Sequence, residues 1–287
     1  MKILIFDGFS ILNRGFYALP LLANSNGEYT NAIYGFLSMF FRFIDEEKPD
    51  YITVAFDLPQ PTFRHNIYAA YKGTRKTMPN ELRSQIPVLK NLLKLMQISI
   101  AESPGFEADD IIGTLCIKAE QDGHMPVVIS GDKDLLQLAT DKTMIRIPKT
   151  SKGKTEVENY YAKDVQAKYG VNPRAYIDIK ALMGDTSDNI PGVPGIGEVT
   201  ASKIIIQYGS LENAIDHATE IKPKKASQNL LEYKDQAILS RELATIVLDA
   251  PIEPDYRAID ILNNLAFEEI KRLELKTFFK RFTQENV

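Results

Sequence analysis

The feature that most constrains the fold is a set of three short strand-like runs that each end in an aspartate. These runs are KILIFD (2 to 7), YITVAFD (51 to 57) and PVVISGD (126 to 132). Stretches with helical periodicity separate them, for example residues 32 to 47 and 108 to 123. Strands that alternate with helices predict an α/β fold, with a mostly parallel central sheet and helices on both faces. Asp7, Asp57 and Asp132 would then lie at the carboxyl ends of strands, where such sheets carry their functional sites.

The strand pattern fades near residue 160, after which helical patterns dominate. We therefore expect an α/β core over residues 1 to 160 and a helical region over residues 161 to 287, packed on the core. A loop, MGDTSDNIPGVPGIG (183 to 197), interrupts the helical patterns, and residues 221 to 228 are the most loop-like stretch after it. The 287 residues are 44% hydrophobic, which suffices for a sizeable core.

The cysteine count and the hydropathy pattern indicate the cellular compartment. The single cysteine, Cys116, excludes an intramolecular disulfide and lies in an apolar run, where we expect a small buried side chain. The N-terminus lacks the apolar core and cleavage site of a signal peptide, and no apolar run approaches the ~18 residues of a membrane span. We expect a cytoplasmic protein that does not associate with membranes.

Carboxylates recur at the places where the predicted site would form. A single aspartate after a strand is more often a helix cap or a turn residue. Recurrence favours a shared function, because like charges this close repel by roughly 1 kcal/mol per pair unless cations neutralise them. The candidates are Asp7, Asp57, Glu107, Asp109, Asp110, Asp132, Asp134, Asp185 and Asp188.

Such a set of oxygen ligands favours hard divalent cations, above all Mg²⁺, with Mn²⁺ as a substitute. Zinc does not fit, because His65, His124 and His217 are scattered and the only thiol lies in an apolar run. Two Mg²⁺ ions ~4 Å apart can activate water and stabilise the leaving oxygen of a phosphodiester. The acids therefore predict a two-metal phosphodiester hydrolase.

A basic segment could hold the anionic substrate of such an enzyme. Without the nine acids, the formal charge of −4 becomes +5. Residues 61 to 95 contain a single acid, Glu81, and the basic residues Arg64, Lys72, Arg75, Lys76, Arg83, Lys90 and Lys94. Tyr68 and Tyr71 lie between these cations and could stack on bases. A solvated helix surface with tyrosines packed beneath it is the alternative interpretation.

A second candidate for nucleic-acid binding is the glycine-rich stretch GVPGIGEVTASKII (192 to 205). Gly192, Gly195 and Gly197 would let the backbone approach a phosphate, and the helix that follows, with Thr200, would present free N–H groups. A dinucleotide-binding loop does not fit, because the glycines follow an acidic loop and their order is G-x-x-G-x-G.

Over nearly its whole length the chain resembles the 5′ nuclease (flap endonuclease) family. It is most similar to the bacterial form, found as the N-terminal 5′-3′ exonuclease domain of DNA polymerase I or as a free-standing homologue. The motifs that carry the resemblance are IFDG, VAFD, FRH…YKGTR, EADD, SGDKDLLQL and GDTSDNIPGVPGIG. The resemblance implies that Asp7, Asp57, Glu107 and Asp109 hold one metal ion, that Asp132, Asp134, Asp185 and Asp188 serve a second, and that Asp110 contributes between them.

The resemblance also implies how DNA is held. Tyr71, Lys72 and Arg75 would lie beside the scissile phosphate, with Tyr71 stacking on the displaced terminal base. They would stand at the base of a helical arch within about residues 71 to 100, and Arg64, Lys76 and Arg83 would contact DNA. Residues 185 to 207 would form a helix-hairpin-helix that grips duplex DNA with a bound K⁺.

The implied function is structure-specific 5′-3′ exonuclease and flap endonuclease activity in replication and repair. The partner would be branched, flapped or nicked duplex DNA with a free 5′ end, including RNA-primed ends, and the protein would act as a monomer. One alternative is a catalytically weak relative that only binds branched DNA. Another, a phosphatase of the haloacid dehalogenase type, needs a second aspartate where this chain has Phe9.

Overall fold

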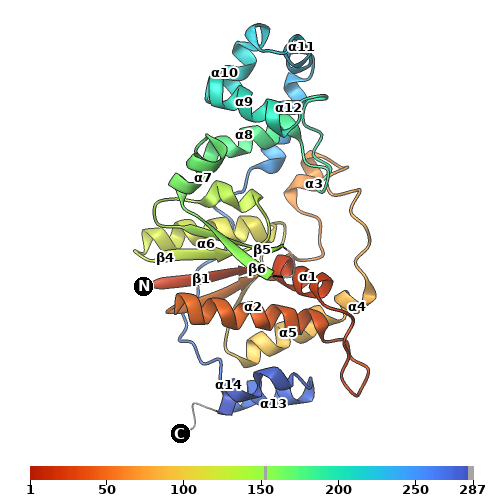
Figure 1. Ribbon diagram of the computed structural model, residues 1–287, viewed down its shortest axis with the longest axis vertical. Helices are drawn as coiled ribbons and strands as arrows, with labels where there is room; N and C mark the ends of the chain where they lie inside the picture. The colour runs from red at the N-terminus through yellow and green to blue at the C-terminus, as the bar shows by residue number, and fades with distance from the viewer. Residues whose placement is uncertain (152–153, 284–287) are drawn as a thin grey trace.

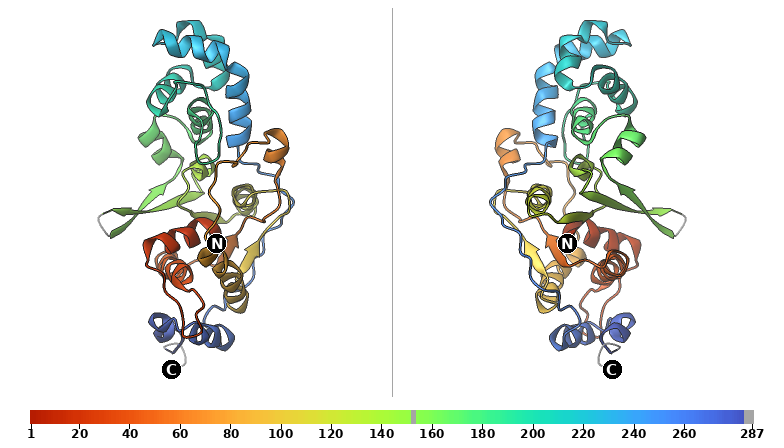
Figure 2. Two further views of the ribbon diagram at one scale, coloured as in Figure 1. Left: turned by 90° about the vertical axis from the view of Figure 1, so that its right-hand side faces the viewer. Right: turned by 90° about the vertical axis from the view of Figure 1, so that its left-hand side faces the viewer.

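A six-stranded sheet forms the centre of the computed structural model, which describes residues 1–151 and 154–283. The strand order is β3-β2-β1-β4-β5-β6, and all neighbours are parallel except β5 and β6. The strands are β1 (Lys2–Asp7), β2 (Tyr51–Ala55), β3 (Ser99–Ala101), β4 (Met125–Ile129), β5 (Met144–Ser151) and β6 (Lys154–Tyr160). The predicted fold class is confirmed, and the β5–β6 ribbon projects from one side of the body (Figure 2).

Helices cover both faces of this sheet (Figure 1). On one face lie α1 (Gly8–Ala18), α2 (Asn31–Glu47) and α5 (Gln85–Leu95), which bury Leu4 and Phe6 of β1. On the other face lies α6 (Ala108–Gln121), which packs on Ile3 and Ile5. Because β1 is buried on both sides, its sequence is a continuous apolar run rather than an alternating one.

Two glycines set the close approach of α1 and α2. A Cβ at Gly35 would lie 2.4 Å from the Cα of Gly15, which is far inside van der Waals contact. Larger side chains at either position would push α2 away from α1, and α1 begins directly at the end of β1. The glycine pair therefore fixes the first helix beside the edge of the sheet where the aspartates lie.

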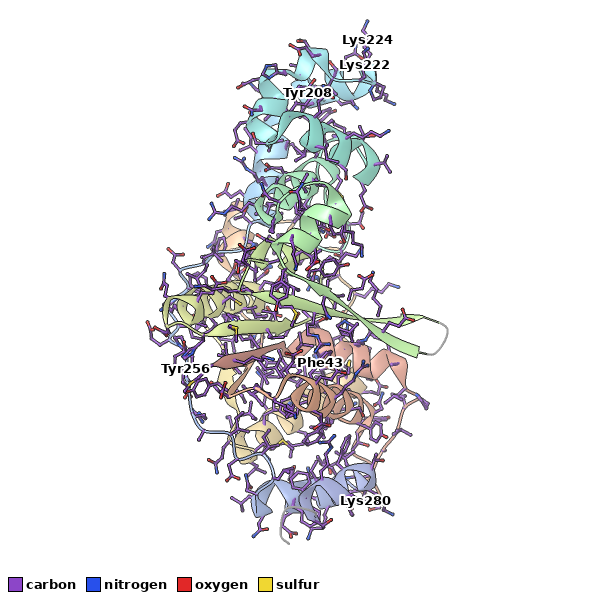
Figure 3. The ribbon with its side chains drawn as sticks, turned by 60° about the vertical axis from the view of Figure 1, so that its left-hand side comes forward. Phe43, Tyr208, Lys222, Lys224, Tyr256 and Lys280 are labelled. Carbon is purple, nitrogen blue, oxygen red and sulfur yellow. The ribbon has the colours of Figure 1, made fainter. Side chains whose placement is uncertain are left out.

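The helical region continues the core of the α/β body. Its helices are α7 (Ala162–Tyr169), α8 (Pro173–Met183), α9 (Glu198–Tyr208), α10 (Leu211–Asp216), α11 (Lys224–Glu232) and α12 (Lys234–Ala244). One hydrophobic cluster extends from the sheet through α8 and α9 to Leu230 of α11. The loop expected over residues 221 to 228 is wrong in its second half, because Ala226 and Leu230, one helical turn apart, bury the inner face of α11. Lys222 and Lys224 lie at the far tip of this region (Figure 3).

The chain then returns along the body to its opposite end. Residues 245 to 263, here called the connecting segment, contain no helix or strand and lead to α13 (Asn264–Arg272) and α14 (Phe279–Thr283). Ile270 and Phe282 of these helices share a cluster with Phe41 of α2 and Leu92 of α5. The last part of the expected helical region therefore packs on the α/β body, as Figure 1 shows.

A row of polar side chains on α6 binds the connecting segment at intervals of four residues. The Oδ1 atom of Asp110 accepts a hydrogen bond of 2.9 Å from the backbone N–H of residue 247, and Oγ1 of Thr114 accepts one of 3.0 Å from that of residue 250. Lys118 donates to the carbonyl of residue 252, and Asp122 accepts from the hydroxyl of Tyr256. Three successive turns of α6 and its C-cap residue, Asp122, thus hold an otherwise irregular stretch of chain.

The expected helical arch differs from what the structure contains. Residues 68 to 79 form turns and extended chain between the short helices α3 (Phe63–Ile67) and α4 (Asn80–Arg83). The following α5 is part of the core, since Leu89, Leu92 and Leu93 are fully buried. Only the first part of the expected range, here called the bridging segment (residues 72 to 79), spans open space. Within the described residues, no helix has the length and apolarity needed to cross a bilayer.

Candidate active site

A cavity of about 720 Å³ lies at the carboxyl edge of the parallel strands. The end of β1, the loop after β2 and the start of α6 form one wall, and the bridging segment and residues 186 to 188 form the other. Six of the nine candidate acids line it: Asp7, Asp57, Glu107, Asp109, Asp132 and Asp188. The predicted convergence of acids from distant parts of the chain is therefore present in the structure.

Four of these acids form no ion pair with a described lysine or arginine, and we call them the acid quartet: Asp7, Asp57, Asp109 and Asp132. Among the described residues, the lysine and arginine ion pairs of the site all go to other acids. Backbone and hydroxyl donors hold the quartet instead. The carboxylate of Asp7 accepts from the N–H of residue 10 at 3.0 Å and from the hydroxyl of Ser130 at 2.6 Å, and Asp57 accepts from the N–H of residue 108 at 2.9 Å.

Burial and repulsion from neighbouring carboxylates raise the pKa values of two quartet members, Asp7 and Asp109. Burial, together with the charges of Asp57 and Asp132, raises the pKa of Asp7 to about 7 despite hydrogen bonds from Ser130 and Ser10. Burial likewise raises the pKa of Asp109 well above its ordinary value, and the charges of the other three quartet members add to the rise. The quartet is thus a concentration of negative charge that a bound cation would relieve.

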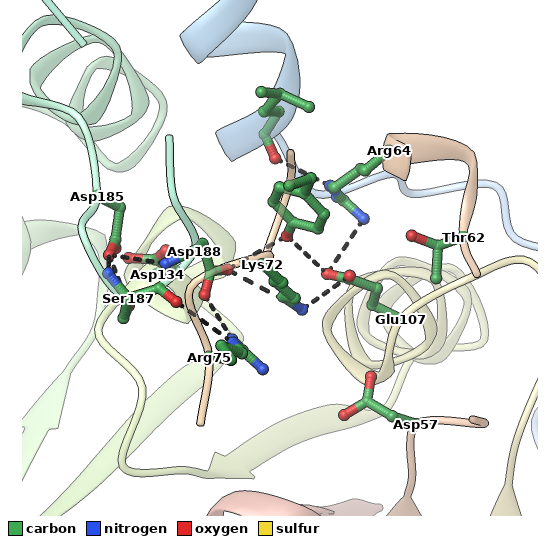
Figure 4. A network of polar contacts seen from close by, with 12 residues as sticks. Asp57, Thr62, Arg64, Lys72, Arg75, Glu107, Asp134, Asp185, Ser187 and Asp188 are labelled. Carbon is green, nitrogen blue, oxygen red and sulfur yellow. Dashed lines mark hydrogen bonds and ion pairs between the residues drawn. The ribbon is translucent and has the colours of Figure 1, made fainter. Parts of the chain in front are cut away.

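Side chains neutralise the remaining acids of the site, and Figure 4 shows these contacts for Glu107 and Asp188. The Nζ atom of Lys72 lies 2.7 Å from Oε1 of Glu107, and Arg75 forms an ion pair with Asp188. Asp134 and Asp185, which do not line the cavity, share a third cation, Lys180 of α8. Sequence reasoning missed Lys180, although its position five residues before Asp185, at the end of a helix entering the acidic loop, was a usable signal.

Asp110 does not fit the predicted role of a metal ligand. Its carboxylate is fully buried and accepts two hydrogen bonds, of 2.7 and 2.8 Å, from the guanidinium of Arg64. It also accepts from the backbone N–H groups of residues 107 and 247. All of its lone pairs are thus directed at protein donors, and the residue joins α6 to the connecting segment.

Arg64 does not fit the predicted contact with DNA for the same reason. Its side chain is only 3% exposed, and its other N–H groups donate to the carbonyls of Leu243 and Thr245. Burial lowers the pKa of this guanidinium, but the charges and hydrogen bonds of Asp110 and the charge of Glu107 outweigh that effect and raise it. Arg64 is a buried structural cation.

Tyr71 cannot stack on a base in this structure, because it is only 3% exposed. Its ring packs against Ile190 and Leu243, and its hydroxyl donates to Glu107 at 3.1 Å and to Asp188 at 3.2 Å. Burial, followed by the charges of these two acids, raises its pKa. Tyr71 therefore contacts two acids of the site and presents little ring surface to solvent.

The donor set of the quartet fits a hard divalent ion, because it offers carboxylate oxygens with no competing ammonium or guanidinium group. Among the described residues, no three acidic, histidine or cysteine side chains are already gathered tightly enough to enclose an ion. Unneutralised carboxylates repel one another, which opposes such close gathering. Magnesium, which keeps several waters and needs few protein ligands, is compatible with it.

Two predicted DNA contacts on the basic segment are exposed. Lys76 lines the cavity from the bridging segment. Arg83 is exposed on α4, just beyond the bridging segment, and does not line the cavity. Lys90, by contrast, pairs with Glu102.

The residues predicted to form a helix-hairpin-helix, 185 to 207, lie after α8 and comprise a loop up to residue 197 and most of α9. Gly192 is not available to DNA, since it is buried, its N–H donates to the hydroxyl of Ser240 at 3.0 Å, and its carbonyl accepts from Gln236 at 2.6 Å. A Cβ there would lie 2.3 Å from the backbone nitrogen of Gly184. Gly192 therefore has a packing role.

The tip of the hairpin is open to solvent. Gly195 and Gly197 are exposed, and Thr200, in the first turn of α9, is half-buried. Asn229 of α11 donates to the carbonyl of Pro194 at 2.6 Å, which holds the tip in place. The first N–H groups of α9 lack partners within the helix and can face an anion.

Comparisons with known proteins decide the family. A model described as 5′-3′ exonuclease, N-terminal resolvase-like domain, matches residues 2–170. A second, described as 5′-3′ exonuclease, C-terminal SAM fold, matches residues 171–265. The chain belongs to the 5′-3′ exonuclease family. The family resemblance indicated by the sequence motifs is confirmed, and the chain is a nuclease.

The curated relatives of this 5′-3′ exonuclease chain are longer proteins. It is 48% identical to DNA polymerase I of Bacillus subtilis (strain 168) over 279 residues, and the aligned region covers 97% of this chain and 31% of the polymerase. It is 43% identical over 284 residues to DNA polymerase I of Caldicellulosiruptor bescii, which covers 98% of this chain and 33% of the polymerase. The chain thus spans about a third of the length of these relatives.

Solved structures share the fold of the 5′-3′ exonuclease chain. T5 5′-exonuclease with bound divalent zinc ions superposes with a TM-score of 0.69 at 22% identity, covering 99% of both chains. The catalytic core of Rad2 in complex with a DNA substrate superposes with a TM-score of 0.61 at 18% identity, covering 95% of this chain and 87% of the other. At these identities the comparison establishes the architecture.

Proposed function

We propose that this chain is a structure-specific 5′ nuclease that hydrolyses phosphodiester bonds of DNA with 5′ flaps or 5′ ends in replication and repair, by two-metal-ion catalysis. The observation that carries the proposal is the acid quartet, which is uncompensated and faces the basic bridging segment across one cavity. An anionic polymer bound between them would bring phosphate oxygens to the place where cations are needed. Family membership and the metal- and DNA-bound structures of similar fold support the same conclusion.

Asp7, Asp57, Asp109 and Glu107 would hold one divalent ion, and Asp132, Asp134, Asp185 and Asp188 would serve a second. Bound Mg²⁺, or Mn²⁺ in its place, supplies Lewis acidity that favours ionisation of water and stabilises the departing 3′ oxygen. Lys72 and Arg75 line the cavity and would offset charge that grows on the phosphoryl oxygens. Both now pair with acids, so an incoming phosphate would take over one of these ion pairs. Tyr71 would keep Glu107 and Asp188 in place during that exchange.

Duplex DNA would be held at a second place, the hairpin tip. Gly195, Gly197 and the first turn of α9 with Thr200 would meet the phosphate backbone, while Lys76 and Arg83 would attract the strand with the free 5′ end. Such contacts read shape rather than base sequence. A K⁺ ion at the hairpin, cleavage of RNA-primed ends, a monomeric state and a cytoplasmic location are part of the proposal.

A cleavage assay tests this function. A 5′-flapped duplex with a labelled 5′ end should be cut in 10 mM Mg²⁺ and left intact in EDTA, and a duplex without a free 5′ end should be cut far more slowly. Asp57→Ala, which removes one quartet ligand with an exposed side chain, should abolish cleavage. Asp216→Ala, which removes an exposed acid of α10, is the matched control and should cleave like the wild type. Cleavage that persists in EDTA or in Asp57→Ala would overturn the proposal.

A further inference from the structure

Lys180 is the least exposed amine among the cations of the site. It lies in the last turn of α8, and its side chain is 13% exposed, against 19% for Lys72 and 48% for Arg75. Its Nζ atom lies 2.8 Å from Oδ1 of Asp134 and also contacts Asp185. One ammonium group therefore bridges carboxylates from two segments of the chain, the turn after β4 and the loop after α8.

The two acids have few other donors. Asp185 accepts from the N–H and the hydroxyl of Ser187 through Oδ1, whereas its Oδ2 contacts Lys180. The carboxylate of Asp134 forms no ion pair with a second cation among the described residues, and it faces the negative charge of Asp132. Without the ammonium group, two half-buried carboxylates would face each other with no positive charge between them.

We propose that Lys180 is a built-in counter-cation that occupies the second metal position of this site, so that its ammonium group must leave when a divalent ion binds between Asp134 and Asp185. The inference rests on the proposed two-metal function. Lys180 is a positioning residue in this account, because it acts on the acids and does not contact substrate. Within the part of the chain that the structure describes, the acid quartet has no such competitor, so the two metal positions differ in kind.

Unequal affinity for two ions follows from this difference. An ion that enters the quartet gains the full attraction of unpaired carboxylates. An ion that enters between Asp134 and Asp185 must first break two ion pairs and move a buried amine into solvent. Without DNA, the second ion should therefore bind much more weakly than the first.

Binding of Mn²⁺ to the DNA-free protein tests the inference, with free ion measured by electron paramagnetic resonance. Wild type should show one tighter and one weaker class of sites. Lys180→Met should bind the weaker ion at least about tenfold more tightly, because the competing charge is gone. Lys180→Arg, which keeps the charge, should bind like the wild type. Lys168→Met is the matched control, since Lys168 pairs with Glu158 on the β5–β6 ribbon, outside the acid cluster, and should change neither class.

The outcomes separate the possible roles of Lys180. If it only supported the fold, its removal would leave the affinity for the second ion unchanged or lower it, and either result would overturn the inference. Should Lys180→Met fail to fold, Lys180→Gln, whose amide can still donate to Asp134, takes its place with the same expectation. Asp134→Asn combined with Lys180→Met should cancel the gain, because the ion loses a ligand. Since no DNA is present, the result is independent of whether the protein cleaves flaps.

Discussion

Replacement of Arg64 by methionine gives a quantitative test of how the site is supported. The guanidinium makes two hydrogen bonds to Asp110 and one each to the carbonyls of Leu243 and Thr245, all between 2.7 and 2.9 Å. Removing one partner of a buried ion pair costs about 3–5 kcal/mol, since the other charge stays buried. The free energy of unfolding of Arg64→Met should fall by that amount, which lowers Tm by roughly 6–20 °C for a chain of this size.

Guanidinium chloride denaturation followed by circular dichroism at 222 nm measures this loss, because the chain has no tryptophan. The matched control is Lys76→Met, which removes an exposed cation of the bridging segment and should leave stability within about 0.5 kcal/mol of wild type. In DNA binding we expect the reverse: Lys76→Met should change the salt dependence of binding, and Arg64→Met should not. Lys76→Met should reduce the slope of log K against log salt by about 0.9, the value of one phosphate contact, and folded Arg64→Met should keep it.

The opposite pattern would refute the reasoning. If Arg64→Met were as stable as wild type and lost about one unit of salt slope, the buried pair with Asp110 would be wrong and Arg64 would contact DNA as the sequence first suggested. Comparing both variants at 10 °C, where each is folded, keeps the two effects separate.

Three further perturbations probe other parts of the molecule. Asp134→Ala should reduce flap cleavage by at least about a hundredfold while leaving the affinity for a flapped duplex in EDTA within about threefold of wild type, as measured by gel shift and single-turnover rates. Tyr71→Phe should lose about 1–2 kcal/mol of stability in denaturation, since two buried acceptors lose a donor. Partial burial raises the pKa of Glu158, but hydrogen bonds from Lys149, Tyr160 and Lys168 outweigh the effect of burial and lower this pKa to about 2. The stability that ionised Glu158 contributes is therefore present above its unfolded-state pKa of about 4.3 and is lost as pH falls toward 2. The Tm difference between wild type and Glu158→Gln should accordingly be positive at pH 7 and disappear near pH 2.

Sequence reasoning located three of the four quartet members from local signals. Asp7, Asp57 and Asp132 end strand-like runs, and parallel strands bring their carboxyl ends to one edge. No comparable signal distinguishes Asp110 from Asp109, since both are acids in the first turn of α6 and only their orientation differs. That orientation depends on Arg64 and on the connecting segment, which are far away in sequence.

The bounds of the arch show the same limit. A basic helix with apolar residues has the same sequence pattern whether it packs its apolar face on a core or spans open space. Leu89, Leu92 and Leu93 of α5 are buried because α2 and α13 lie against them, and neither contact can be read from residues 85 to 95. Gly192 and Lys180 likewise acquire their roles from partners in other helices.

The polar row on α6 has a consequence for the order in which the molecule assembles. Asp110 receives hydrogen bonds from residue 64 in the first quarter of the chain and from residue 247 in the last, so its environment is complete only when both have arrived. Contacts between such distant positions carry a large loop-closure entropy and form late in folding. On a ribosome, the acid-bearing end of α6 would emerge long before its final partners, and nuclease activity would be withheld until the last quarter of the protein had been synthesised.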